Sequence, residues 1–103
     1  QTGTSIWDPT AGKRIAITSI VISAYGTTAG KVTLWFGGSG DTTYSAGTDQ
    51  AALVVNLAPS ATATPGISFT PKTPVFCPTA DHELRITTDA AISLDITLEG
   101  YEY

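Results

Sequence analysis

Residues 92–99 read Ile-Ser-Leu-Asp-Ile-Thr-Leu-Glu, with an apolar side chain at every second position and polar side chains between them. Successive side chains of a β-strand point to opposite faces of the sheet. This alternation therefore predicts a strand with one face buried and the other in water. The stretch also contains Ile and Thr, whose branched β-carbons favour extended backbone. Residues 92–99 predict an antiparallel sheet that packs against a core on one side only.

Two further segments alternate in the same way. Residues 83–88 predict a strand, and the turn at 89–91 joins it to the stretch above. In the segment 14–24 the isoleucines alternate with one phase before Ser19 and with the opposite phase after it. A change of phase inside a strand predicts a β-bulge, or a bend between two sheets.

The segment 31–36 alternates as well, with Trp35 on its half-polar face. We therefore expect Trp35 to be partly exposed or to lie at an interface. The residues Gly-Gly-Ser-Gly-Asp at 37–41 predict a flexible hairpin loop. Residues 42–45 follow this loop and predict another strand.

The middle of the chain is less regular. The nearly continuous apolar run 51–57 predicts a strand buried on both sides. Residues 58–78 hold five of the six prolines. Proline cannot donate a ladder hydrogen bond, so we expect the strands at 67–69 and 75–77 to be short or to lie at sheet edges.

Composition supports an all-β class. The chain has 103 residues, of which 42% are hydrophobic and 14% charged, which is enough apolar material for the core of one domain. Thr, Val and Ile favour strands, while Gly and Pro supply the turns. We predict a single-domain antiparallel β-sandwich of seven to eight short strands over residues 11–103, with the jelly roll as one candidate form.

Residues 1–10 predict an N-terminal arm, because they are polar apart from Ile6 and Trp7. This pair either folds back on its own domain or docks on a neighbouring chain, since aromatic anchors are favoured at interfaces. Tyr101 and Tyr103 share one strand parity near the end of the chain, which also suggests docking. The candidate partner contacts are Ile6, Trp7, Trp35, Tyr44 and Tyr101.

Charge and cysteine content exclude several classes of function. The net charge is −4 and the five cations are scattered, so we expect no nucleic-acid partner. No apolar run approaches the roughly 18 residues of a membrane span, so we expect no membrane partner. Cys77 is the single cysteine and cannot form a disulfide within the chain.

The few residues that could carry chemistry have simpler explanations. Consecutive strand residues point to opposite faces, so at most Asp81 and Glu83 of the run around His82 could share a metal ion. Cys77 lies between Phe76 and a proline, where a cysteine acts as a small hydrophobic residue. We predict no catalytic, cofactor-binding or metal-binding residues, and no enzymatic activity.

Several short stretches resemble one known group of proteins. The opening Gly-Lys-Arg-Ile and the closing Gly-Tyr-Glu resemble small β-sandwich virion structural proteins of tailed phages. In that group a GK-R/K-I strand and a GYE strand bracket the fold. The resemblance covers most of the chain and rests on 11–17, 20–24, 31–36, 84–88 and 94–102.

This resemblance implies a viral structural protein, most specifically a capsid decoration (cement) protein on the capsid surface, or a component of a head fibre or tail. It implies a homo-oligomer, with a trimer favoured, that binds the major capsid protein or another virion protein. Two alternatives remain open. A carbohydrate-binding module or the receptor-binding tip of a phage fibre would stack Trp35 and the tyrosines on sugars. A subunit of an extracellular filament would use its arm to complete a neighbour's sheet.

Overall fold

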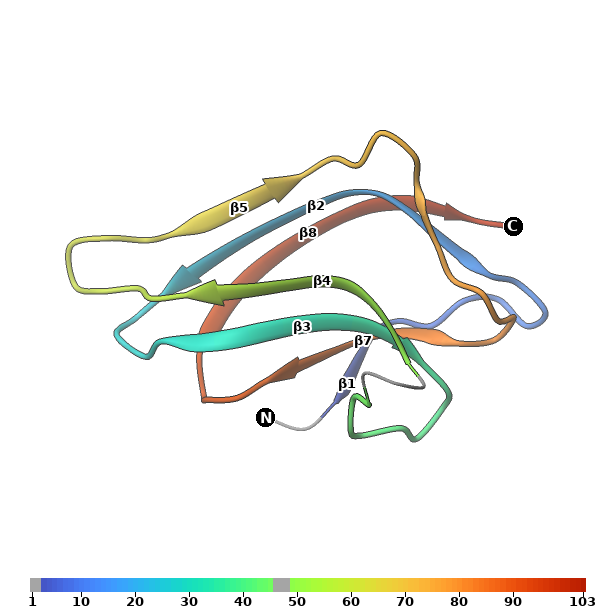
Figure 1. Cartoon of the computed structure of the whole chain (residues 1–103), viewed down its shortest axis with the longest axis horizontal. Coiled ribbons are helices and arrows are strands. Elements are labelled where there is room, and N and C mark those ends of the chain that lie inside the picture. Colours follow the sequence, from blue (N-terminus) through green and yellow to red (C-terminus); the bar gives the residue numbers. More distant parts are fainter. Residues whose placement is uncertain (1–2, 46–48) are drawn as a thin grey trace.

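The computed structural model describes residues 3–45 and 49–103, which form two antiparallel sheets with a shared core (Figure 1). Sheet A has the strand order β1–β7–β3–β4. In sheet B, β2 pairs with β8 on one side and with β5 and β6 on the other. The described residues contain no helix, which confirms the predicted all-β sandwich, whereas the jelly-roll form stays a prediction. The strands are β1 (Thr4–Trp7), β2 (Ile15–Tyr25), β3 (Gly30–Gly37), β4 (Gln50–Leu57), β5 (Gly66–Phe69), β6 (Val75–Phe76), β7 (Glu83–Thr88) and β8 (Ser93–Glu102).

Strand β2 is the centre of sheet B and carries the expected irregularity. β8 pairs along the whole of β2, and the register shifts between Ile17 and Ser19. Thr18 is therefore an extra residue, a β-bulge that turns the isoleucines before and after it towards the same side. The phase change predicted at Ser19 is confirmed, and the core-facing isoleucines of β2 are fully buried: Ile15, Ile17, Ile20 and Ile22.

The two strands predicted from regular alternation also form. β7 has the predicted bounds 83–88, and β8 begins at Ser93 and runs on to Glu102. The inward side chains of β8 are half-buried, since they pack against the core from an edge strand. Strands β5 and β6 are short and lie at the edge of sheet B, as the prolines predicted.

Two expectations about sheet A are wrong. Residues 51–57 form most of β4, but this strand is not buried on both sides, because β4 is an edge strand that pairs only with β3 among the described strands. Its burial alternates instead, and Val54 is 51% exposed. Residues 42–45 are not a strand. Here Thr42 accepts a hydrogen bond from the Gly3 backbone N–H at 2.8 Å, so this loop meets the start of the described chain.

Candidate interaction surface

Ile6 and Trp7 lie in β1, which pairs with β7 of the same chain. Of the two alternatives for this segment, the structure therefore has it folded back on its own domain. Ile6 is 37% exposed and leaves some apolar surface for a partner. Trp7 is half-buried against the core, and its indole N–H donates to Glu102 Oε2 at 3.1 Å.

Glu102 holds the segment that joins β1 to β2. Its Oε1 atom accepts a hydrogen bond from the backbone N–H of Thr10 at 2.9 Å, in addition to the indole bond at Oε2. These bonds, the one from Thr10 first and the one from Trp7 second, lower the pKa of the Glu102 carboxyl below its ordinary value. The ionised carboxylate therefore ties the N-terminal segment to the end of β8.

Trp35 is fully buried, so the expectation that it is partly exposed is wrong. Its side chain points outward from sheet A, and the segments that meet there cover it. Tyr44 packs on it with ring centroids 5.9 Å apart and a 54° tilt. The indole N–H donates to Thr87 Oγ1 at 2.9 Å. Trp35 therefore offers no surface to a partner, and Tyr44 is half-buried over it.

A buried ion pair lies on the same outer face of sheet A. Arg85 is opposite Trp35 in the β3–β7 register, and its Nη1 atom lies 2.9 Å from Glu83 Oε1. Both side chains are less than a tenth exposed. The other guanidinium nitrogen, Nη2, donates to the Gly3 carbonyl oxygen at 3.2 Å. The outer face of sheet A thus forms a second, partly polar core beneath Gly3 and the 38–45 loop.

Tyr101 is different, because it belongs to an exposed group of rings. Tyr101 is 46% exposed, and Phe76 and Tyr103 are each 42% exposed. The centroids of Phe76 and Tyr103 are 5.6 Å apart with an 86° angle between the rings. Those of Tyr101 and Tyr103 are 6.3 Å apart at 59°. We call these three residues the aromatic cluster.

The register of sheet B brings the aromatic cluster together. Phe76 of β6 and Tyr101 of β8 both pair with Ala16, from opposite sides of β2. Ala16 points away from the main core, and its small side chain is fully buried beneath the rings. The Tyr103 hydroxyl donates to the Cys77 carbonyl oxygen at 3.2 Å and so crosses from β8 to the end of β6. The cluster is therefore fixed to the outer face of sheet B.

The three rings of the aromatic cluster do not lie in one plane. Tyr103 is tilted at 86° to Phe76 and at 59° to Tyr101, so the cluster presents ring edges as well as ring faces. Asp95 and Glu99 are exposed on β8, at positions of the same parity as Tyr101. Glu99 is two residues from Tyr101, and the exposed Arg14 pairs through its backbone with Tyr103, so charges of both signs lie beside the apolar rings.

Sequence reasoning found only part of this cluster. Tyr101 was singled out, and the shared parity with Tyr103 pointed to both residues. Phe76 was missed, because its position depends on the pairing of β6 with β2, which brings together segments far apart in the sequence. No local pattern around Phe76 signals that contact.

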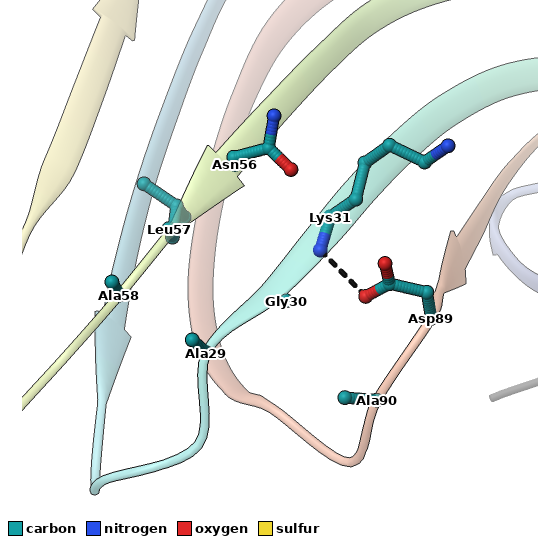
Figure 2. Close-up of a pocket in the computed structure, with 8 residues that line it drawn as sticks. All are labelled: Ala29, Gly30, Lys31, Asn56, Leu57, Ala58, Asp89 and Ala90. Atoms are coloured by element: carbon teal, nitrogen blue, oxygen red, sulfur yellow. Dashed lines mark hydrogen bonds between the residues drawn. The ribbon is translucent and has the colours of Figure 1, made fainter.

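A separate shallow groove of about 470 Å³ lies at one end of sheet A (Figure 2). Asp89 Oδ1 accepts a hydrogen bond from the Lys31 backbone N–H at 2.6 Å, which holds the β7–β8 turn against the start of β3. A side chain at Gly30 would meet this carboxylate, since a Cβ there would lie 2.9 Å from Oδ1. Asp89 therefore has a structural role. The groove is lined by Ala29, Gly30, Lys31, Asn56, Leu57, Ala58, Asp89 and Ala90.

The residues considered for metal or nucleophilic chemistry do not gather into a site. Within residues 3–45 and 49–103, no group of three or more His, Cys, Asp or Glu side chains could hold a metal ion. The Cys77 thiol is buried, and this burial raises its pKa. A raised pKa keeps the thiol protonated and unreactive at neutral pH. Its S–H donates to the Thr79 carbonyl oxygen at 3.2 Å.

Comparison with known proteins does not extend these observations. No protein-family model, no curated protein and no solved structure matches the chain. In the part of the chain that the structure describes, no helix is long and apolar enough to cross a membrane. The fold, the aromatic cluster and the sequence resemblance given above are the features that bear on function.

Proposed function

We propose that this protein is a non-enzymatic structural protein that binds another protein through the aromatic cluster on sheet B. The proposal rests on the exposure of three aromatic rings, each at least 42% exposed, of which Tyr103 packs against both of the others. Aromatic side chains are enriched at the centres of protein interfaces and supply much of their binding energy.

The cluster is also held in place before any partner binds. Its rings pack against one another, and the Tyr103 hydroxyl is bonded to the Cys77 carbonyl oxygen. Ordering a free side chain at an interface costs about 0.5–1.5 kcal/mol, so rings that are already ordered save part of that cost.

The more specific form of the proposal is a capsid decoration protein. It rests on the resemblance of the opening and closing strands to virion structural proteins of tailed phages. In this form the partner is the major capsid protein or another virion protein, and the protein resides on the virion. A small β-sandwich with few charges and no disulfide meets the requirements of a subunit present in many copies.

The direct test is cosedimentation with empty capsids assembled from the major capsid protein of the same genome. Tyr101→Ser removes an exposed ring from the cluster and should weaken binding about tenfold or more, as expected for an interface anchor. Tyr25→Ser is the matched control, because Tyr25 is 47% exposed and lies at the other end of β2, opposite Ser93.

Three outcomes of this test would count against the proposal. If the genome encodes no capsid protein, or if the protein does not sediment with capsids, the decoration role is wrong. If Tyr25→Ser weakens binding as much as Tyr101→Ser does, the aromatic cluster is not the contact. If Tyr101→Ser instead abolishes binding to glycans, the carbohydrate-binding alternative replaces the protein-binding one.

A further inference from the structure

We propose that two copies of this chain associate through the free edge of β4, which would join two four-stranded A sheets into one continuous sheet across a two-fold axis. An unpaired strand edge presents backbone N–H and C=O groups that another strand can bond. The partner at this edge is a second copy of the same chain. This association uses sheet A and does not depend on the aromatic cluster of sheet B.

The other edges of the two sheets are protected against strand addition. β1 has four residues, and its register is irregular between Ser5 and Trp7. The edge made by β5 and β6 lies in the proline-rich segment of the chain. The β8 edge carries Asp95 and Glu99, whose charges would repel those of a second copy. Short length, proline, bulges and charge are the usual protections of strand edges.

The β4 edge lacks most of these protections. Its sequence, Gln-Ala-Ala-Leu-Val-Val-Asn-Leu, contains neither charge nor proline. A shift in register against β3 occurs near Ala52, and the strand is regular from Leu53 to Leu57. Val54 is the most exposed large hydrophobic side chain in the described part of the structure, at 51%. Leu53 and Val55, which face the core, are only half-buried.

The geometry of an antiparallel ladder leads from this edge to a second copy. Alternate residues of β4 bond to β3, and the residues between them turn their N–H and C=O groups to the free side. Two β4 strands related by a two-fold axis run antiparallel and offer each other the same groups. β1 also lacks charge and proline, but it has only four residues and an irregular register, whereas β4 has eight residues. A second copy therefore has no equally suitable described edge to offer in place of β4.

This arrangement differs from the trimer that the sequence resemblance implies. A ring of three copies joined by strand pairing would need two different open edges on each copy. When the β4 edge pairs with the β4 edge of a second copy, neither copy has this edge left to offer, so the assembly stops at two copies. The mass of the assembled protein in solution therefore separates the two expectations.

The test is sedimentation equilibrium of the intact protein over a range of concentrations. The wild-type protein should form a dimer. Val54→Lys places a charge at the centre of the proposed seam and should weaken dimer formation at least tenfold. Val21→Lys is the matched control, because Val21 is 39% exposed but lies on β2, an inner strand of sheet B. It should dimerise as the wild-type protein does.

Asn56→Lys is a second variant, in case Val54→Lys fails to fold, because Asn56 is exposed on the same strand with the same parity. It should also weaken dimer formation at least tenfold. A wild-type protein that stays monomeric or forms a trimer would overturn the proposal. Equal weakening of the dimer by Val21→Lys and Val54→Lys would also overturn it, and so would a folded Asn56→Lys variant that dimerises normally. These results leave the capsid-binding test untouched, because that test depends on Tyr101.

Discussion

The outer faces of the two sheets each carry aromatic residues, but only one of these groups is exposed. On sheet A, Trp35 is fully buried beneath Tyr44 and the surrounding segments. On sheet B, the aromatic cluster of Phe76, Tyr101 and Tyr103 remains open to solvent. The difference lies in what covers each face. An aromatic side chain on the outward face of a strand is a stability element where a loop folds over it, and a docking candidate where none does.

The largest expected loss of folding free energy comes from a substitution on the outer face of sheet A, where side chains are covered. Arg85→Ala leaves the Glu83 carboxylate buried without its partner and also removes the bond to the Gly3 carbonyl. Losing one member of a buried ion pair typically costs about 3–5 kcal/mol of folding free energy. Urea unfolding of the variant measures the loss. Arg14→Ala, which removes an exposed cation, should stay within about 0.5 kcal/mol. A loss below about 1 kcal/mol for Arg85→Ala would mean that the pair is not desolvated.

A smaller effect is expected where Trp35 meets the backbone. A Cβ at Gly37 would overlap the Trp35 ring, which cannot move in its packed site. Gly37→Ala should therefore destabilise the protein by about 1–3 kcal/mol, the usual cost of overpacking. The neighbouring variant Gly38→Ala is the control, since its nearest contact would be 3.5 Å from the Asp41 carboxylate. Thermal unfolding measures the melting temperature of each variant. If Gly37→Ala and Gly38→Ala lowered the melting temperature equally, the close packing at Gly37 would be contradicted.

On the outer face of sheet B, a substitution should weaken capsid binding and leave the folding free energy nearly unchanged. Tyr101→Ser removes a ring that is 46% exposed, so the folding free energy should fall by less than about 1 kcal/mol. Capsid binding should weaken about tenfold or more at the same time. Urea unfolding alongside cosedimentation measures both quantities on one sample. A loss of several kcal/mol would indicate that Tyr101 is part of the core, and the contrast between the two faces would not hold.

The smallest effect concerns the carboxylate beside Trp7. Its pKa is lowered in the folded protein, so ionised Glu102 stabilises the fold above its ordinary pKa of about 4.3, and this stabilisation is lost as the pH falls through the lowered folded value. Glu102→Gln should thus be slightly less stable than wild type near pH 7. The difference in free energy of unfolding between the two proteins, measured in urea, should disappear in acid. Glu99→Gln, on the same strand, controls for the loss of charge. If this difference in free energy of unfolding increased in acid, the lowered pKa of Glu102 would be contradicted.

Local patterns predicted much of this fold. Alternation identified β7 and β8, and the phase change at Ser19 identified the bulge in β2. The burial of Trp35 could not be predicted, because it depends on loop 38–45 and Gly3 meeting over β3. An apolar run likewise cannot distinguish an edge strand such as β4 from a buried inner strand. Phe76 joins Tyr101 through Ala16, a contact between three separate strands.

Hydroxyl-radical footprinting of the protein, free and bound to capsids, tests the central claim most directly. It reports the solvent exposure of individual aromatic side chains. Binding should reduce the oxidation of Tyr101 and Tyr103 several-fold and leave Tyr25 unchanged, while Trp35 should be protected in both states. Protection of Tyr25 with unchanged oxidation of Tyr101 would contradict the assignment of the aromatic cluster as the docking surface.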